Sequence, residues 1–190
     1  KFVIYIIFAA TAHKSAILML PIAGLAASRN RLNILFWMAV LGTAGYFIFL
    51  ADSIDFFMYG YIELDYQSQG ALVRLLMNAL PSLILLLFFR RFEFPPGEKR
   101  IWFWFALISI GLFGLFFIFP SSSALDRVAL YMLPIQIVAF SYFPDIFSKD
   151  KIISGFLILL IIIYYGFVQF VWLNYAVNSW AWLPYQNIII

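Results

Sequence analysis

The stretch Pro120–Gln136, with the sequence PSSSALDRVALYMLPIQ, sets the interpretation of the whole chain. Its polar start is a hinge between two apolar runs of membrane-spanning length. Ser121–Ser123 can cap the next helix, because a serine oxygen accepts a hydrogen bond from a first-turn N–H. An acid and a base follow, Asp126 and Arg127, and Arg127 shares a helix face with Tyr131. An arginine at the head of a transmembrane helix is costly unless it meets water, a partner or an anion, so the stretch indicates a site.

The composition places the chain in a membrane. Of its 190 residues, 65% are hydrophobic and only 11% are charged, whereas soluble domains carry roughly 25% charged residues. The apolar runs are near the helical spanning length, so we expect an all-α, polytopic transmembrane helix bundle. The absence of cysteine and the single histidine argue against a disulfide and against a metal site. The net charge of +3 follows the membrane connections, and no nucleic-acid partner is expected.

About six membrane segments are predicted, in one transmembrane domain over residues 1–190. The apolar blocks are Phe2–Ala27, Asn33–Ala51, Ala71–Phe89, Ile101–Phe119, Leu125–Phe143 and Ile152–Leu173. The first block is interrupted at His13 and Lys14, and it fits either one tilted span or two half-helices that meet in a re-entrant turn. The chain opens without an initiator methionine or a signal pattern, and we expect it to be the C-terminal part of a longer membrane protein.

The basic residues predict the orientation. Two, four and two of the twelve Lys and Arg fall in 28–31, Arg90–Arg100 and 148–151, which alternate along the chain. The opposite connection Asp52–Gly70 holds four acids and no base. Because basic residues accumulate on the cytoplasmic side, this acidic loop is predicted to lie outside.

The outer side carries the unusual residues. Tyr59 and Tyr61 lie among carboxylates in the acidic loop, and Arg74 enters the third segment directly after it. Aromatic rings stack on sugar faces while polar groups bond sugar hydroxyls, so the loop suits a carbohydrate. The alternative is an interfacial aromatic belt, and for Arg127 a simple headgroup anchor.

His13 and Lys14 form an ionisable pair inside an apolar block, which favours a functional role. The alternatives are a histidine satisfied by a backbone carbonyl and a lysine that snorkels to the interface. Together with Arg74 and Arg127 they would give an outward-opening cavity with positive charge. Such a cavity suits a lipid-linked diphosphate, because arginine binds phosphate oxygens in a bidentate fork.

Three segments resemble those of a known family. Ala12–Ala16 (AHKSA) with Leu20–Pro21 resembles the H-x-S-A … L-P segment of the EpsG-like, Wzy-type polysaccharide polymerases. Leu125–Tyr131 (LDRVALY) resembles their R-x-x-x-Y segment, and Trp182–Tyr185 (WLPY) is similar to the W-x-P-Y close of many members.

The resemblance implies a multi-pass enzyme of the bacterial inner or plasma membrane that acts without a metal, nucleotide or other cofactor. It would join undecaprenyl-diphosphate-linked oligosaccharide repeat units by glycosyl transfer at the outer face, beside a chain-length regulator or a flippase. By motif position His13, Arg127 and Tyr131 carry over, whereas Arg74 and Asp126 come from the charge pattern. Either His13 or Asp126 would act as the base. Lys14 departs from the family pattern, because many members have an aromatic residue there.

Two other classes stay open. A transporter or flippase would use the same cavity to pass a lipid-linked or polar substrate, and paired broken helices would favour it. A structural membrane subunit would need none of the outer charges.

Overall fold

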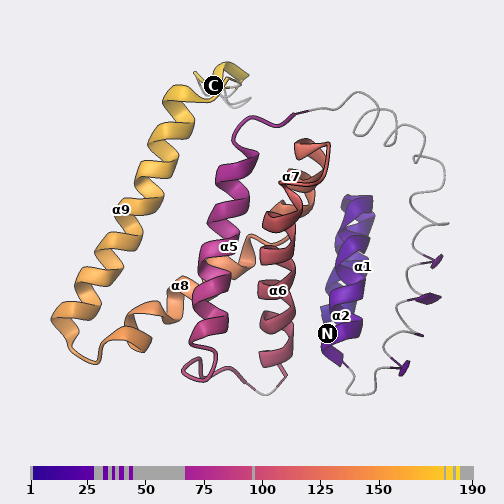
Figure 1. Cartoon of the computed structure of the whole chain (residues 1–190), viewed down its shortest axis with the longest axis horizontal. Coiled ribbons are helices and arrows are strands. Elements are labelled where there is room, and N and C mark those ends of the chain that lie inside the picture. The colour runs from indigo at the N-terminus through magenta and orange to yellow at the C-terminus, as the bar shows by residue number, and fades with distance from the viewer. Residues whose placement is uncertain are drawn as a thin grey trace. The chain divides into compact units, whose positions relative to one another are not determined.

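The computed structural model describes residues 2–27, a few positions between 32 and 44, 67–95, 97–177, 179–181, 183 and 184. These residues form helices and no strand, which confirms the all-α class. The elements are α1 (Phe2–Ala12), η1 (Lys14–Met19), α2 (Leu20–Ala27), α5 (Ala71–Leu87), α6 (Lys99–Leu115), α7 (Ser122–Leu130), α8 (Pro134–Phe147), α9 (Lys151–Tyr175) and η5 (Ser179–Ala181) (Figure 1). The chain divides into two compact units, residues 1–139 and 140–190. Most of the expected second segment and the acidic loop up to residue 66 lie outside the described residues.

The first apolar block takes the broken form. The helix α1 ends at Ala12, His13 adopts an extended backbone (φ −143°, ψ 109°), and the chain continues in the 3-10 helix η1. The helix α2 then packs back against α1, so the segment enters and leaves at the same end (Figure 1). Of the two forms that the sequence allows, the structure has the pair of half-helices, with His13 at their turn.

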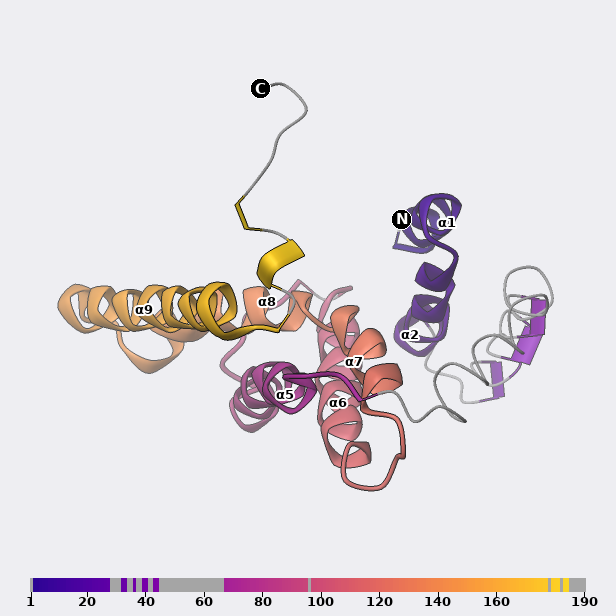
Figure 2. The same ribbon diagram turned by 90° about the horizontal axis from the view of Figure 1, so that it is seen from above.

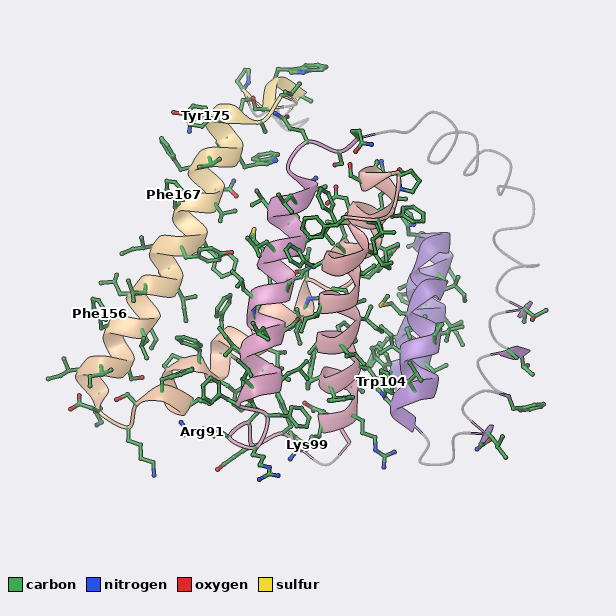
Figure 3. The ribbon with its side chains drawn as sticks, viewed as in Figure 1. Arg91, Lys99, Trp104, Phe156, Phe167 and Tyr175 are labelled. Carbon is green, nitrogen blue, oxygen red and sulfur yellow. The ribbon has the colours of Figure 1, made fainter. Side chains whose placement is uncertain are left out.

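An antiparallel hairpin of α5 and α6 forms the centre of the first unit. The two helices make the most extensive contact in the chain, and α2 and α7 each pack against α6 (Figures 1 and 2). Their connection is held by Phe92, which is buried and stacks on Phe94 at 5.3 Å between ring centroids. The side chains of Arg91 and Lys99 project at this end (Figure 3). The basic turn 90–100 is therefore a packed end of the hairpin.

The polar and apolar faces of α5 are inverted relative to a soluble protein. Its buried face includes Asn78 and Ser82, which are 2% and 0% exposed. Its exposed face is a stripe of leucines three or four residues apart, Leu72, Leu76, Leu80, Leu83 and Leu87. Polar groups that face other helices and apolar groups that face outward are expected of a helix whose solvent is lipid.

The predicted cap at the start of α7 is present. Ser121 is the N-cap residue, and its hydroxyl accepts a hydrogen bond from the Ala124 N–H at 3.4 Å. The segment Leu125–Phe143, in contrast, was expected to form one continuous helix, and it does not. It consists of α7 and α8, which are bent by 57° at a short break. The reason is Pro134, which has no N–H to continue the helix and disfavours helical backbone at the residue before it.

One described helix, α9, is by itself long and apolar enough to cross a membrane, and the bent α7–α8 pair passes the same test if it is one span. Within the second unit α9 buries none of its residues, and Phe156, Phe167 and Tyr175 project from it (Figure 3). The helices α1 and α5 are apolar but shorter. The expected count of about six spans stays a prediction.

The hairpin gives a direct test of orientation. The turn 90–100 lies one helix length, about 26 Å along the α5 axis, from residue 69, and Gln69 is exposed. At Gly97 an added Cβ has no heavy atom within 4 Å. The variant Gln69→Cys should react with a membrane-impermeant maleimide in intact cells, whereas Gly97→Cys should react only after permeabilisation. Reaction of Gly97→Cys alone in intact cells would reverse the orientation.

Candidate functional site

An ion pair between Arg74 and Asp126 links the start of α5 to α7. The guanidinium Nε lies 2.6 Å from Oδ1 of the carboxylate and Nη2 lies 2.5 Å from Oδ2, so the contact is bidentate. Relative exposure is 36% for the arginine side chain and 12% for the aspartate side chain. A parallel pair of charge-assisted hydrogen bonds of this kind fixes the geometry of both side chains. Two residues 52 positions apart in the sequence therefore form one rigid polar group.

Ser68 completes this group. Its hydroxyl donates to Asp126 Oδ2 at 2.8 Å and accepts from Arg74 Nη2 at 2.9 Å, while its backbone N–H donates to the Ser122 hydroxyl at 2.8 Å. The next link is Gln67, whose side-chain amide donates to the Pro120 carbonyl at 2.9 Å. The end of the acidic loop is thus docked on the start of α7, as expected of two connections on one side of the membrane.

A glycine turn places the arginine in this arrangement. Gly70 precedes α5 with φ +77°, a left-handed conformation that glycine adopts without strain. The turn lets Arg74 Nη2 also donate to the Gln69 carbonyl at 3.1 Å. A Cβ added at Gly70 would meet Arg74 Nη1 at 3.5 Å. That distance is an ordinary van der Waals contact, so the need for glycine at this position comes from its positive φ.

The remaining hydrogen-bonding capacity indicates what the group can bind. Within the described part of the chain, Arg74 Nη1 has no hydrogen-bond acceptor, so two of its N–H donors are available. The Asp126 carboxylate has about four acceptor positions, of which Arg74 and Ser68 occupy three. A donor and an acceptor held side by side match a sugar hydroxyl, which both accepts and donates.

Arg127 takes a different direction from Asp126. Successive helical residues do not share a face, so Asp126 turns toward α5 while Arg127 is exposed. The bidentate partner of Asp126 is therefore Arg74 and not its neighbour Arg127. Tyr131 follows at the C-cap of α7 and is half-buried.

The other predicted residues are placed in part. His13 is exposed at the turn between α1 and η1. The backbone of Lys14 opens η1, and its side chain lies outside the described residues, as do Tyr59 and Tyr61. One outward cavity shared by His13 and both arginines stays a prediction.

Comparison with known proteins now identifies the chain's family. The EpsG family model matches residues 1–187. The chain belongs to the EpsG family. No match was found among curated proteins or among solved structures. EpsG membership confirms the resemblance carried by the three motif segments.

Membership in the EpsG family has a functional consequence. It indicates a membrane-associated role in polysaccharide biosynthesis, of the polymerase or glycosyltransferase-like kind. The site fits that role, because its open donors and acceptor suit carbohydrate hydroxyls.

Sequence reasoning found Arg74 and Asp126 but not their pairing, and it missed Ser68 and Ser122. The sequence did contain a signal for the pairing of Arg74 with Asp126. Each charge stands one turn inside the start of an apolar segment on the predicted outer side, and two costly opposite charges at one membrane depth are expected to pair.

The pairing predicts strong energetic coupling. Removing one partner leaves the other charge unpaired, whereas replacing both by apolar residues removes the problem. Asp126→Leu should therefore lower the melting temperature more than the double variant Arg74→Leu/Asp126→Leu does. Thermal unfolding in detergent of Asp126→Leu, Arg74→Leu and the double variant should give a coupling free energy of roughly 0.5–3 kcal/mol. Additive effects of the two substitutions would contradict the ion pair.

Proposed function

We propose that this EpsG-family protein joins undecaprenyl-diphosphate-linked oligosaccharide repeat units by glycosyl transfer at the outer face of the bacterial inner or plasma membrane. One observation carries the proposal: Asp126, which pairs with Arg74 of α5, lies on the same turn of α7 as the exposed Arg127, at the end of the hairpin away from the basic turn 90–100. A fixed polar group next to an exposed cation suits a substrate that is part sugar and part diphosphate.

Arg127 is assigned to the diphosphate. The guanidinium of Arg74 is neutralised by Asp126, so it is a poor counter-ion for a second anion. Arg127 is exposed on the same turn of α7 as Asp126, where a substrate can reach it. A planar guanidinium can bind two phosphate oxygens at once and stabilise the charge that develops as the lipid diphosphate departs.

The Arg74–Asp126 pair is assigned to the acceptor sugar. Its open Nη1 donors and its remaining carboxylate lone pair would orient the attacking hydroxyl and a neighbour. This role differs from phosphate binding by Arg74, which the charge pattern alone had suggested. Three hydrogen bonds on Asp126 also favour orientation over proton abstraction as its task, because most of its acceptor positions are occupied.

His13 is the base in this scheme. It stands at the turn of the broken first segment, which points toward the α7 end of the unit (Figure 1). The acceptor oxygen attacks the anomeric carbon of the donor chain, and the bond from that carbon to the diphosphate oxygen breaks. The acceptor proton passes to His13, and the undecaprenyl diphosphate leaves against Arg127.

Further contacts would come from the sugar side. We assign substrate binding to Lys14 and to three tyrosines, Tyr59, Tyr61 and Tyr131. The tyrosine rings would stack on sugar rings. A protein that limits chain length and a flippase that delivers the repeat units are the partners that this function implies.

A transporter or flippase is the second candidate, and one observation favours it. Two described segments are broken, the first at His13 and the second between α7 and α8. Discontinuous helices near the membrane midplane form the substrate sites of many transporters. Such a protein would carry the lipid-linked unit across the membrane without joining two of them.

The variant Arg127→Lys separates chemistry from anchoring. Lysine keeps the charge but loses the planar fork. A charge-assisted hydrogen bond is worth roughly 1.5–3 kcal/mol, and each 1.4 kcal/mol is about tenfold in rate. Arg127→Lys should therefore reduce polymer formation at least about tenfold at unchanged membrane abundance. The measurement is the chain length and amount of surface polysaccharide in cells that carry only the variant gene.

A matched control is Arg90→Lys, which makes the same change at an exposed arginine of the basic turn. It should give polymer of normal length. If Arg127 were a headgroup anchor, both lysine variants would behave like the parent protein, because lysine and arginine snorkel alike.

A further inference from the structure

A buried amide pair lies below the ion pair, between α5 and the bent α7–α8 segment. Asn78 and Gln136 are 2% and 3% exposed. The Gln136 side-chain amide donates to Asn78 Oδ1 at 2.6 Å, and Asn78 Nδ2 donates to the backbone carbonyl of Ala129 at 2.8 Å. Asn78 on α5 is therefore bonded both to the last turn of α7 and to the first turn of α8.

The carbonyl that Asn78 binds belongs to the break itself. Where α7 ends, three successive hydrogen bonds span three residues instead of four, from Tyr131, Met132 and Leu133 back to Val128, Ala129 and Leu130. In lipid, backbone groups at a helix break need partners from neighbouring helices. Asn78 supplies such a partner to the Ala129 carbonyl, which also accepts from the Met132 N–H at 3.0 Å.

The helix α5 thus holds the bent segment at two levels. Arg74 and Asn78 stand four residues apart, on one face of α5. Their partners, Asp126 and Ala129, stand three residues apart on α7. The outer contact fixes the start of α7, and the inner one fixes its end and the first turn of α8 through Gln136.

We propose that Asn78 is a positioning residue, which sets the angle of the α7–α8 break and thereby the direction in which α7 presents Arg127 and Tyr131. The consequence for polymer formation rests on the proposed function; the consequence for the break does not. Hydrogen bonds between membrane helices add little net stability, because the alternatives in the membrane also find partners. Two buried amides at a break therefore favour a geometric role.

The break can be measured directly, because the chain has no cysteine. Spin labels on cysteines at Ser123, in the first turn of α7, and at Ile137, which is 73% exposed on α8, report the distance across the break. In Asn78→Leu the distance distribution should shift or broaden, since leucine has no group for the Ala129 carbonyl. Polymer formation, measured per folded protein, should fall at least about fivefold, because a misplacement of about 1 Å by a change far from the chemistry can cost on the order of 100-fold in rate.

Ser82→Ala is the matched control. Ser82 is also fully buried on α5, four residues further along, but its hydroxyl donates only to the Asn78 carbonyl of its own helix, at 2.7 Å. Loss of that bond should leave both the distance and the polymer unchanged. Gln136→Leu, which keeps the bond to Ala129, should give an intermediate distance distribution, and it replaces Asn78→Leu if that variant does not reach the membrane.

The outcomes separate this proposal from the proposed function. An unchanged distance distribution in both leucine variants would overturn the role of Asn78 at the break. A changed distance with normal polymer would overturn its positioning role, provided that Arg127→Lys does reduce polymer. If Arg127→Lys also leaves the polymer normal, the proposed function fails, and a changed distance still supports the role of Asn78 at the break.

Discussion

The bidentate ion pair between Arg74 and Asp126 is the contact on which the rest of the site depends. Either charge alone would be costly near the head of a membrane helix. Together, with the Ser68 hydroxyl on the carboxylate, they satisfy each other and join two segments that are far apart in the sequence. The helix α7 is only nine residues long, so its contact with α5 through this ion pair largely fixes its position. The position of α7 in turn determines where Arg127 lies.

Composition and local pattern predicted much of the local structure. The apolar runs predicted helices, the serines before α7 predicted its cap, and the interruption at His13 predicted a break as one of two forms. Each of these depends on residues within a few positions of one another. The inverted faces of α5, with amides inside and leucines outside, agree with the membrane setting that the composition indicates.

The site needed tertiary information. Charge pattern identified Arg74 and Asp126 separately, as a phosphate ligand and a base, but only the fold shows that they bind each other. The segment 125–143 was expected to be continuous because hydropathy does not register the missing N–H of Pro134. The amide contact from Asn78 to the Ala129 carbonyl involves a backbone atom, so the identity of residue 129 gave no signal for it. Tyr59 and Tyr61 lie outside the described residues, and their part in sugar binding stays a prediction.

The proposed function divides two tasks between two arginines of an EpsG-family protein. Arg74, neutralised by Asp126, orients sugar hydroxyls, and the exposed Arg127 receives the diphosphate. Because Asp126 and Arg127 are neighbours on α7, the two groups would hold the acceptor sugar and the donor diphosphate close together, in the orientation that transfer between two lipid-linked chains needs. A transporter would use the same charges, but it would carry the repeat unit across the membrane without joining it to another.

The most direct test measures, in lipid vesicles, whether repeat units are joined or only carried across the bilayer. Full-length protein, reconstituted with a defined undecaprenyl-diphosphate oligosaccharide and no nucleotide or metal, is incubated, and the products are separated by size. A polymerase that works as proposed gives a ladder of joined repeat units and releases undecaprenyl diphosphate. Repeat units that cross the bilayer but remain single would show that the protein is a transporter and not a polymerase.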